Sequence, residues 1–418
     1  MASKSSLDLP TAEKLQRARR ASSEVARLDT ARKNVLLNEI AARITENREK
    51  ILRANHADMG ACDLEGTMRN RLMLNNARIQ AMADAVRDVA KLEDPVGRAL
   101  AEWTRPNGLR IRKVAVPLGV IGVIYESRPN VTVDAATLAL KAGNAVVLRG
   151  GREAVRSNEA LVEILNGVTG MPQGAIELLD SQSRDSAAAL IRAREFVDVV
   201  IPRGGAGLIS WVAENATVPV IETGAGNCHI FVDASAELDM AELIIVNAKT
   251  QRPSVCNAAE KVLLHADVAP SFARRIVETL QSHGVEVRGD AATCELAAEL
   301  PVRPAQSDDW NTEYLDLTIC IGVVKNVDIA IEHINRHSTH HSDAIITSDE
   351  KRAQEFLQRV DSAAVYWNAS TRFTDGGEFG FGAEMGISTQ KLHCRGPFAL
   401  AELTSTKFEI IGQGQIRP

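Results

Sequence analysis

Short apolar runs alternate with amphipathic segments from residue 109 onward. The segment 109–126 (LRIRKVAVPLGVIGVIYE) first alternates apolar with polar residues and then becomes almost continuously apolar. This pattern predicts an exposed strand that leads into a buried one, because strands covered by helices on both faces need no polar side. The repeated strand-helix order predicts an α/β fold with parallel sheets and right-handed crossovers.

The predicted strands fall into two series, which indicates two α/β domains. Between them, Glu222 is followed by Gly224 and Gly226, and we expect the chain to pass from one domain to the other at 223–227 because two glycines free the backbone. Residues 10–100 carry apolar residues at helical spacing and predict a helical layer. The strands are expected at 145–149, 175–179, 197–201 and 218–222, and then at 229–233, 261–265, 285–289, 318–324, 343–347 and 363–367.

Composition excludes several classes of partner. The 418 residues are enough for two or three domains with large cores. A net charge of −6 leaves no basic face for a phosphate backbone, so no nucleic acid partner is expected. The first ten residues are polar, unlike a secretory signal, and no apolar run approaches the roughly 18 residues of a membrane span. We therefore expect a cytoplasmic protein that does not bind membranes.

Cys256 lies in the polar run 249–259 (KTQRPSVCNAA), 34 residues after Glu222. A thiol in a polar loop is a candidate nucleophile, and Lys249 and Arg252 are nearby cations that can lower its pKa. The alternative is a packing cysteine, because free cysteine is among the most buried residue types. Together with a carboxylate at the end of a predicted strand, the thiol indicates chemistry on a carbonyl group.

Two segments are candidates for holding phosphate groups. The stretch 202–205 (PRGG) joins a predicted strand to a predicted helix, whose N-terminal amides can bind a pyrophosphate, although a tight turn explains it equally well. Neither this stretch nor 380–385 completes a dinucleotide fingerprint. Arg149, Arg152 and Arg156 follow a predicted strand and can receive a ribose 2′-phosphate, the alternative being a solvated charged loop.

One histidine cluster is a candidate metal site. His337, His340 and His341 precede Asp343 near the end of a predicted helix. Imidazoles in that position are also explained as surface cations at the negative end of the helix dipole. We expect this second explanation and no bound metal.

Several segments together resemble the aldehyde dehydrogenase superfamily, and within it the γ-glutamyl phosphate reductase family, whose members are also called glutamate-5-semialdehyde dehydrogenases. They follow one another in family order over nearly the whole chain after residue 10. The segments are 114–135 (VAVPLGVIGVIYESRPNVTVDA), 144–154 (NAVVLRGGREA), 200–209 (VIPRGGAGLI), 219–233 (PVIETGAGNCHIFVD), 249–265 (KTQRPSVCNAAEKVLLH), 311–319 (NTEYLDLTI) and 378–389 (EFGFGAEMGIST).

The resemblance implies a role for individual residues. Cys256 matches the nucleophile, Asn130 the asparagine whose amide holds the oxyanion, and Glu222 the glutamate that activates water in hydrolytic relatives. Here Glu222 is expected to support the site or contact the cofactor, because water attack would waste an activated substrate. The resemblance also implies cofactor contacts at Arg149, Arg152, Gly204, Gly205 and Glu313, and substrate contacts at Ser370, Thr371 and Arg372. Arg252, in the same run as Cys256, is a further candidate substrate contact because its charge can meet a leaving phosphate.

The implied fold is aldehyde dehydrogenase-like, with two parallel-sheet α/β domains and a small β arm. Residues 1–101 and 117–223 are expected to form the NADP-binding domain with its helical N-terminal layer. Residues 224–394 are expected to form the catalytic domain with the cysteine loop. The arm and the C-terminal segment take 102–116 and 395–418, and the arm implies a homodimer or a homotetramer.

The implied reaction is the NADPH-dependent reduction of γ-glutamyl 5-phosphate to glutamate 5-semialdehyde and phosphate through a thioester on Cys256, the second step of proline biosynthesis from glutamate. NADPH is expected over NADH because Arg152 stands where NAD-using relatives have a ribose-binding glutamate, and a cation attracts a 2′-phosphate. A transient association with glutamate 5-kinase, which makes the unstable acyl phosphate, is a further expectation. Two alternatives stay open: a hydrolytic NAD(P)-dependent semialdehyde dehydrogenase and a non-catalytic binding protein of the same fold.

Overall fold

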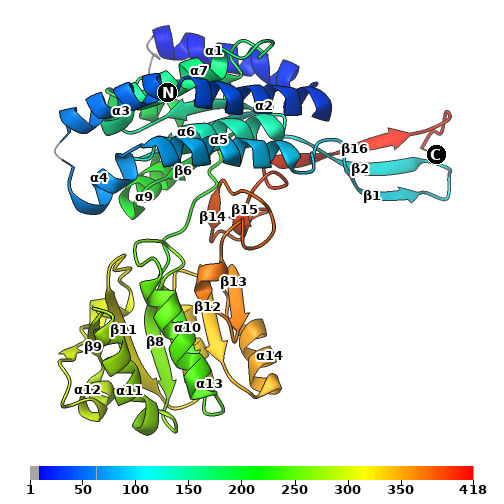
Figure 1. Cartoon of the computed structure of the whole chain (residues 1–418). Coiled ribbons are helices and arrows are strands. Elements are labelled where there is room, and N and C mark those ends of the chain that lie inside the picture. Colours follow the sequence, from blue (N-terminus) through cyan, green and yellow to red (C-terminus); the bar gives the residue numbers. More distant parts are fainter. Residues whose placement is uncertain (1–8, 63, 418) are drawn as a thin grey trace, which may run out of the picture. The chain divides into compact units, whose positions relative to one another are not determined.

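The computed structural model describes residues 9–62 and 64–417 and divides into two compact units. The first unit comprises residues 1–223, 381–386 and 398–418, and the second comprises 224–380 and 387–397. Figure 1 shows that each unit has its own sheet flanked by helices. No helix within the described ranges is long and apolar enough to cross a membrane.

The first unit is built on a four-stranded sheet of order β5-β4-β3-β6, in which all neighbours are parallel. Its strands are β3 (Val120–Tyr125), β4 (Ala145–Arg149), β5 (Ile176–Leu178) and β6 (Val199–Arg203). Its helices are α1 (Leu9–Val25), α2 (Thr30–Glu46), α3 (Arg48–Ala61), α4 (Gly66–Leu72), α5 (Asn76–Lys91), α6 (Asn130–Lys141), α7 (Val155–Asn166), α8 (Arg184–Leu190) and α9 (Ala206–Asn215), with a 3₁₀ turn η1 (Arg152–Ala154).

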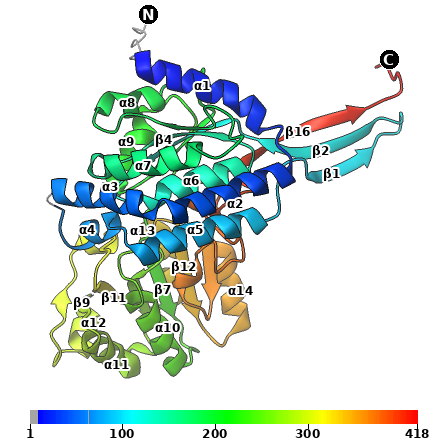
Figure 2. The ribbon, with the colours of Figure 1, turned by 45° about the horizontal axis from the view of Figure 1, so that its top comes forward.

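Helices α1, α8 and α9 contribute to one apolar core against this sheet, in which Leu15, Leu190 and Val212 are fully buried with Ile124 of β3. Helices α6 and α7 also contact the sheet, and α2, α3 and α5 pack on them as an outer layer (Figure 2). The predicted helical layer at 10–100 is thus confirmed as α1 to α5, except that a strand already begins at Ala99.

A three-stranded antiparallel sheet projects from the first unit (Figure 1). It consists of β1 (Ala99–Thr104), β2 (Arg110–Pro117) and β16 (Thr404–Ile411). Trp103 and Phe408 meet edge to face across it with ring centroids 6.2 Å apart. Both remain exposed, as do Ile410 and Ile411, so this arm carries apolar side chains in solvent.

The second unit is built on a seven-stranded sheet of order β10-β9-β11-β8-β7-β12-β13, again with parallel neighbours. Its strands are β7 (Cys228–Val232), β8 (Ala259–His265), β9 (Glu286–Gly289), β10 (Arg303–Pro304), β11 (Thr318–Val324), β12 (Ser342–Ile346) and β13 (Ala364–Trp367). Its helices are α10 (Leu238–Thr250), α11 (Ala269–Ser282), α12 (Ala291–Leu296), α13 (Val327–His337) and α14 (Glu350–Arg359), with 3₁₀ turns η2 (Ser307–Trp310) and η3 (Thr371–Phe373). Strands β14 (Gly386–Ser388) and β15 (Gly396–Phe398) pair separately.

Two apolar cores hold the second unit together. One core packs α10, α11 and α12 against the sheet, with Ile245, Phe272 and Ala297 buried. The other packs α13 and α14, with Ile334 and Phe356 fully buried. These cores account for the continuous apolar runs in the sequence, because the central strands have helices to bury them. The predicted α/β fold with parallel sheets is confirmed.

Some local predictions are wrong. The segment 218–222 is not a strand but makes a single bridge, between Val200 and Val220, and Pro219 in its middle cannot donate to a ladder. Along the C-terminal part, 381–386 belong to the first unit, whereas the sequence placed them with the second. The predicted arm at 102–116 and 395–418 is found as β1, β2 and β16, although β1 already begins at Ala99 and β16 only at Thr404.

Candidate functional site

Cys256 lies in the loop that connects α10 to β8, and its side chain is half-buried. The Sγ–H group of Cys228, the first residue of β7, donates to the backbone oxygen of Cys256 at 3.2 Å. A Cβ atom at Gly226 would overlap the same oxygen, so only glycine fits there. Gly226 therefore serves close packing against the cysteine loop, and the boundary between the two units lies at Thr223 and Gly224, within the predicted 223–227.

The residue after the cysteine ties its loop to a second loop. The Asn257 side-chain amide donates to the backbone oxygen of Thr374 at 2.8 Å, and the Thr371 hydroxyl donates to the backbone oxygen of Asn257 at 2.7 Å. Thr371 is fully buried and holds the loop through this bond, while its predicted contact with the substrate stays a prediction. The structure thereby brings residues 370–372, predicted as substrate contacts, next to Cys256.

Two guanidinium groups lie at this loop. Arg372 is half-buried, contacts the side-chain oxygen of Asn257 and donates through Nε to Gln251 at 2.8 Å. Burial lowers the pKa of Arg372, and the neighbouring positive charge of Arg252 lowers it further. Two neighbouring positive charges repel each other, so an anion such as a phosphate group would be stabilised between them.

Lys249 does not act as predicted. It is fully buried and forms an ion pair with Glu260, with Nζ and Oε2 3.0 Å apart. Its polar sequence context suggested a surface cation beside the thiol, but its charge is satisfied within the protein. Arg252 is thus the predicted cation that stays exposed in the loop.

Glu313 also lies in the second unit. Its carboxylate accepts the backbone N–H of Gly226 at 2.7 Å, and Gly226 is the residue that packs on the Cys256 carbonyl. The loop that carries Glu313 is therefore adjacent to the cysteine loop. Its predicted contact with the cofactor ribose stays a prediction.

Asn130 belongs to the first unit, where it is the first residue of α6. Its side chain donates one amide hydrogen to Asp134 at 2.9 Å. Burial raises the pKa of Asp134 to about 6. Because an amide nitrogen has two hydrogens, this bond orients the side chain and leaves a second donor.

A cavity of about 290 Å³ in the first unit is lined by two arginines, Arg149 and Arg152, and by two glutamates, Glu126 and Glu153. Arg149 ends β4 and donates to the backbone oxygens of Ser181 and Ser183, while its Nε is buried with no hydrogen-bond partner among the described residues. Burial lowers the pKa of Arg149, and the charge of Arg152 adds to this effect. An anionic phosphate fits such a pair of cations. Arg156 is instead paired with Asp58, so it does not complete the predicted trio.

The glycine turn Gly204–Gly205 precedes α9 in the first unit. The carboxylate of Glu126 accepts the backbone N–H of Gly205 at 2.8 Å, and a Cβ atom at Gly204 would overlap that carboxylate. An acidic group therefore occupies the helix N-terminus, which is where the sequence placed a cofactor phosphate. Glu222 lies in the irregular segment between α9 and β7 and is half-buried.

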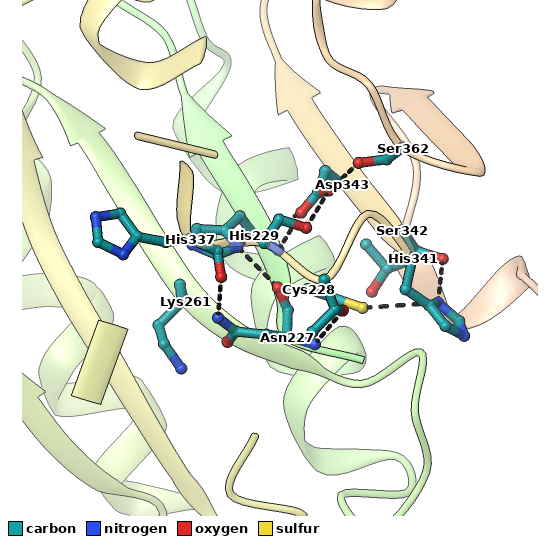
Figure 3. Close-up of polar contacts among 12 residues, drawn as sticks. Asn227, Cys228, His229, Lys261, His337, His341, Ser342, Asp343 and Ser362 are labelled. Atoms are coloured by element: carbon teal, nitrogen blue, oxygen red, sulfur yellow. Dashed lines mark hydrogen bonds and ion pairs between the residues drawn. The ribbon is translucent and has the colours of Figure 1, made fainter. Parts of the chain in front are cut away.

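Within the histidine cluster, His337, in the last turn of α13, and His340 are half-buried, and the surface-cation interpretation is wrong for His341. His341 is fully buried, its ring contacts Cys228 and Ser342, and burial lowers its pKa to about 4 (Figure 3). Asp343 is also fully buried and accepts the backbone N–H of His229 at 2.7 Å. These side chains form an internal network at the ends of β7 and β12. The described residues include no group of three or more His, Cys, Asp or Glu that could hold a metal ion.

The sequence model of the aldehyde dehydrogenase family matches residues 10–296, more than half of the chain. A γ-glutamyl phosphate reductase of Koribacter versatilis is 64% identical over 409 residues, which are 98% of this chain and the whole of that relative. The chain belongs to the γ-glutamyl phosphate reductase family of aldehyde dehydrogenases.

Solved structures agree with this family assignment. The crystal structure of a γ-glutamyl phosphate reductase from Thermotoga maritima superposes with a TM-score of 0.95 at 50% identity, covering 98% of this chain and all of the other. A propionaldehyde dehydrogenase from Clostridium phytofermentans gives a TM-score of 0.68 at 17% identity, with 96% and 97% of the two chains covered. This second likeness shows the fold alone. Membership of the γ-glutamyl phosphate reductase family makes the chain an oxidoreductase of a family that uses nicotinamide cofactors.

Sequence reasoning missed three residues that shape the site. Cys228 and Asn257 were not singled out, and Glu126 was not connected to the glycine turn. The only local signal for Asn257 is its place next to Cys256 in a polar loop. For the other two, the partner lies 28 and 79 residues away, and nothing in the local sequence identifies it.

Proposed function

We propose that the protein reduces γ-glutamyl 5-phosphate to glutamate 5-semialdehyde and phosphate with NADPH, the second step of proline biosynthesis from glutamate. The observation that carries the proposal is the loop of Cys256, whose carbonyl is fixed by Cys228 and Gly226 and which lies beside two cations, Arg252 and Arg372. Relatives that match 97% or more of this chain over 99% or more of their own length, at 64% and 53% identity, carry the reductase name.

Cys256 supplies the nucleophile in this proposal. An unperturbed thiol has a pKa of about 8.5, so nearby positive charge is needed to raise the thiolate fraction at neutral pH. The thiolate forms an S–C bond with the acyl carbon, and the C–O bond to the phosphate group breaks. Phosphate leaves with the bonding electron pair, and Arg252 and Arg372 stabilise its charge.

NADPH, when bound, supplies the hydride that reduces the resulting thioester. The S–C bond to Cys256 then breaks with its electron pair on sulfur, which releases glutamate 5-semialdehyde and restores the thiolate. Arg149 and Arg152 would hold the 2′-phosphate of NADPH, Gly204 and Gly205 its pyrophosphate, and Glu313 its nicotinamide ribose. The pair of cations with an unpartnered Nε atom fits a phosphate group. At the glycine turn, the cofactor phosphate would take the place at the helix N-terminus that the Glu126 carboxylate holds in this structure.

Asn130 and Glu222 have supporting roles. The free amide hydrogen of Asn130 donates to the oxyanion that develops on the substrate carbonyl, while the other stays on Asp134. Glu222 contacts the cofactor or supports the site and does not activate water, because hydrolysis of the thioester would prevent its reduction. Metal ions have no part in the proposal.

The proposal extends to the assembly. The exposed apolar side chains of the arm formed by β1, β2 and β16 favour a homodimer or homotetramer. A cytoplasmic location and a transient association with glutamate 5-kinase complete the proposal, the latter because an acyl phosphate is unstable in water.

A reverse assay tests the reaction. Glutamate 5-semialdehyde and NADP⁺ are expected to give NADPH, measured by its absorbance, only when inorganic phosphate is present, because phosphate must release the acyl group from the thiol. Arsenate is expected to replace phosphate, since it is a chemically similar oxyanion. NADPH formation at the same rate without either anion would show a hydrolytic dehydrogenase instead.

Arg152→Ala is expected to raise the KM for NADPH by about tenfold to a hundredfold, because a hydrogen bond to a charged group contributes roughly 1.5–3 kcal/mol. The KM for NADH should change less than twofold, since NADH has no 2′-phosphate. Steady-state kinetics with both cofactors measure this. Arg156→Ala is the matched control: Arg156 is in the same segment but pairs with Asp58. An equal loss for both cofactors in Arg152→Ala would contradict the assignment.

A further inference from the structure

A buried ion pair closes the base of the cysteine loop. Lys249 lies in the last turn of α10 and Glu260 is the second residue of β8, so the two residues flank the connecting loop on either side. Their charged atoms are 3.0 Å apart and both side chains are fully buried. The pair therefore fixes the distance between the points where the Cys256 loop leaves the helix and enters the strand.

The same pair reaches a second loop. The other carboxylate oxygen of Glu260 accepts the backbone N–H of Leu315 at 3.2 Å. Next to it on β8, the fully buried Lys261 donates to the backbone oxygen of Thr312 at 2.7 Å, with its ammonium group 4.5 Å from the ring centre of Tyr314. The residues on both sides of Glu313 are thus held by charged groups of β8.

The two loops meet at Gly226. Glu313 accepts its backbone N–H, and the Cys256 carbonyl packs against its α-carbon, which has no room for a side chain. A shift of either loop would disturb both contacts. One buried charge cluster, formed by Lys249, Glu260 and Lys261, therefore controls the register of the cysteine and the glutamate.

Stability alone does not explain such a cluster. Removing charges from water costs several kcal/mol for each ion, and apolar side chains of similar volume often stabilise a protein as well or better. Here the pair sits beside a large apolar core that could accommodate apolar side chains. Charged groups form directed hydrogen bonds, which apolar side chains cannot do. The presence of such groups here is explained if they hold the two loops in position.

We propose that Lys249 and Glu260 are positioning residues that hold the Cys256 loop and the Glu313 loop in register for the reaction. This inference rests on the proposed function, because it takes Cys256 as the nucleophile. Neither residue needs to contact substrate or cofactor. Their effect reaches the reacting atoms through the backbone of the two loops.

The test uses a double variant, Lys249→Met with Glu260→Gln, which removes both charges, keeps the side-chain volumes and keeps an acceptor for Leu315. Because a misplacement of about 1 Å can lower a rate by about a hundredfold, kcat is expected to fall by about thirtyfold to a hundredfold. The KM for NADPH is expected to rise much less, because the proposed phosphate contacts of NADPH lie in the first unit. The rate at which iodoacetamide alkylates Cys256, followed by peptide mass spectrometry, should fall by at least about threefold. Hydrogen exchange should become faster at 250–259 and 311–316.

The matched control is Lys33→Met with Asp94→Asn. Lys33 and Asp94 form another buried ion pair, 2.9 Å long, in the first unit. This control is expected to change stability in a similar way but to leave kcat and the alkylation rate within about twofold of the wild type. A merely structural role for Lys249 and Glu260 predicts the same result for both double variants, which would overturn the inference.

Glu260→Asp is the second variant, and it tests the positioning role if the double variant does not fold. It keeps the charge balance, but its shorter side chain cannot reach both Lys249 and Leu315. A fall of about tenfold in kcat supports the inference, and unchanged kcat overturns it. A separate result would contradict the proposed function: Cys256→Ser would keep the turnover of the wild type. In that case hydrogen exchange at the two loops would still show whether the ion pair holds them in place.

Discussion

Cys256→Ser is expected to lower the turnover of γ-glutamyl phosphate reduction on the order of 10⁴-fold or more, because a serine hydroxyl is hardly ionised at neutral pH. NADPH binding should be preserved, since the proposed phosphate contacts lie in the first unit and the cysteine in the second. The assay is phosphate-dependent NADPH formation from the semialdehyde, with cofactor binding followed by fluorescence.

Cys294→Ser provides the matched control for this prediction. Cys294 is also half-buried and in the second unit, but its Sγ–H donates to the backbone oxygen of Gly289 and its pKa is raised, first by burial and then by Asp290. Its replacement should leave turnover within about twofold. If Cys256→Ser keeps more than a tenth of the wild-type turnover, Cys256 is not the nucleophile.

The fold was predictable because its signals are local. Buried parallel strands need continuous apolar residues, and the helices between them show one apolar face, so the alternation along the sequence follows from burial alone. The failure at 218–222 has the same origin. Its apolar composition resembled a strand, but Pro219 leaves only the bridge at Val220.

From the sequence, the site could be predicted only where a single residue stands in an unusual local sequence. Cys256 stood out because a thiol in a polar loop is unusual. Lys249 in the same run looked like a surface cation, yet it is fully buried, because its partner Glu260 becomes its neighbour only when the strand after the loop is in place. His341 was misjudged for the same reason: burial depends on neighbours that the sequence does not identify.

The polar contacts that fix the site join residues far apart in the sequence. The hydroxyl of Thr371 reaches the backbone of Asn257, 114 residues away, and Glu126 reaches Gly205, 79 residues away. Such pairs follow from the order of strands in a sheet and from turn geometry. A single sequence shows that polar residues follow the strands, but it does not show which of them will meet.

Asn130→Ala is expected to lower kcat by about a hundredfold to a thousandfold, the loss that follows the removal of one donor to a developing oxyanion. The KM values should change much less, because this donor acts mainly on charge that is absent from the bound substrate. Asn166→Ala is a suitable control: Asn166 ends α7 in the same unit, and its amide donates to the backbone oxygen of Ile176. Equal effects on kcat in the two variants would contradict an oxyanion role.

The bond from Asn130 to Asp134 adds a pH dependence to this prediction. Because burial raises the pKa of Asp134 to about 6, its carboxylate is charged above that pH and becomes neutral below it. A neutral carboxyl group holds the amide less firmly, so kcat of the wild type should fall as the pH is lowered through about 6. Asp134→Asn has no group that titrates there and should lose this inflection while retaining a bond to Asn130. An inflection near pH 6 that persists in Asp134→Asn must come from another group, and Asp134 would then have no part in orienting the oxyanion donor.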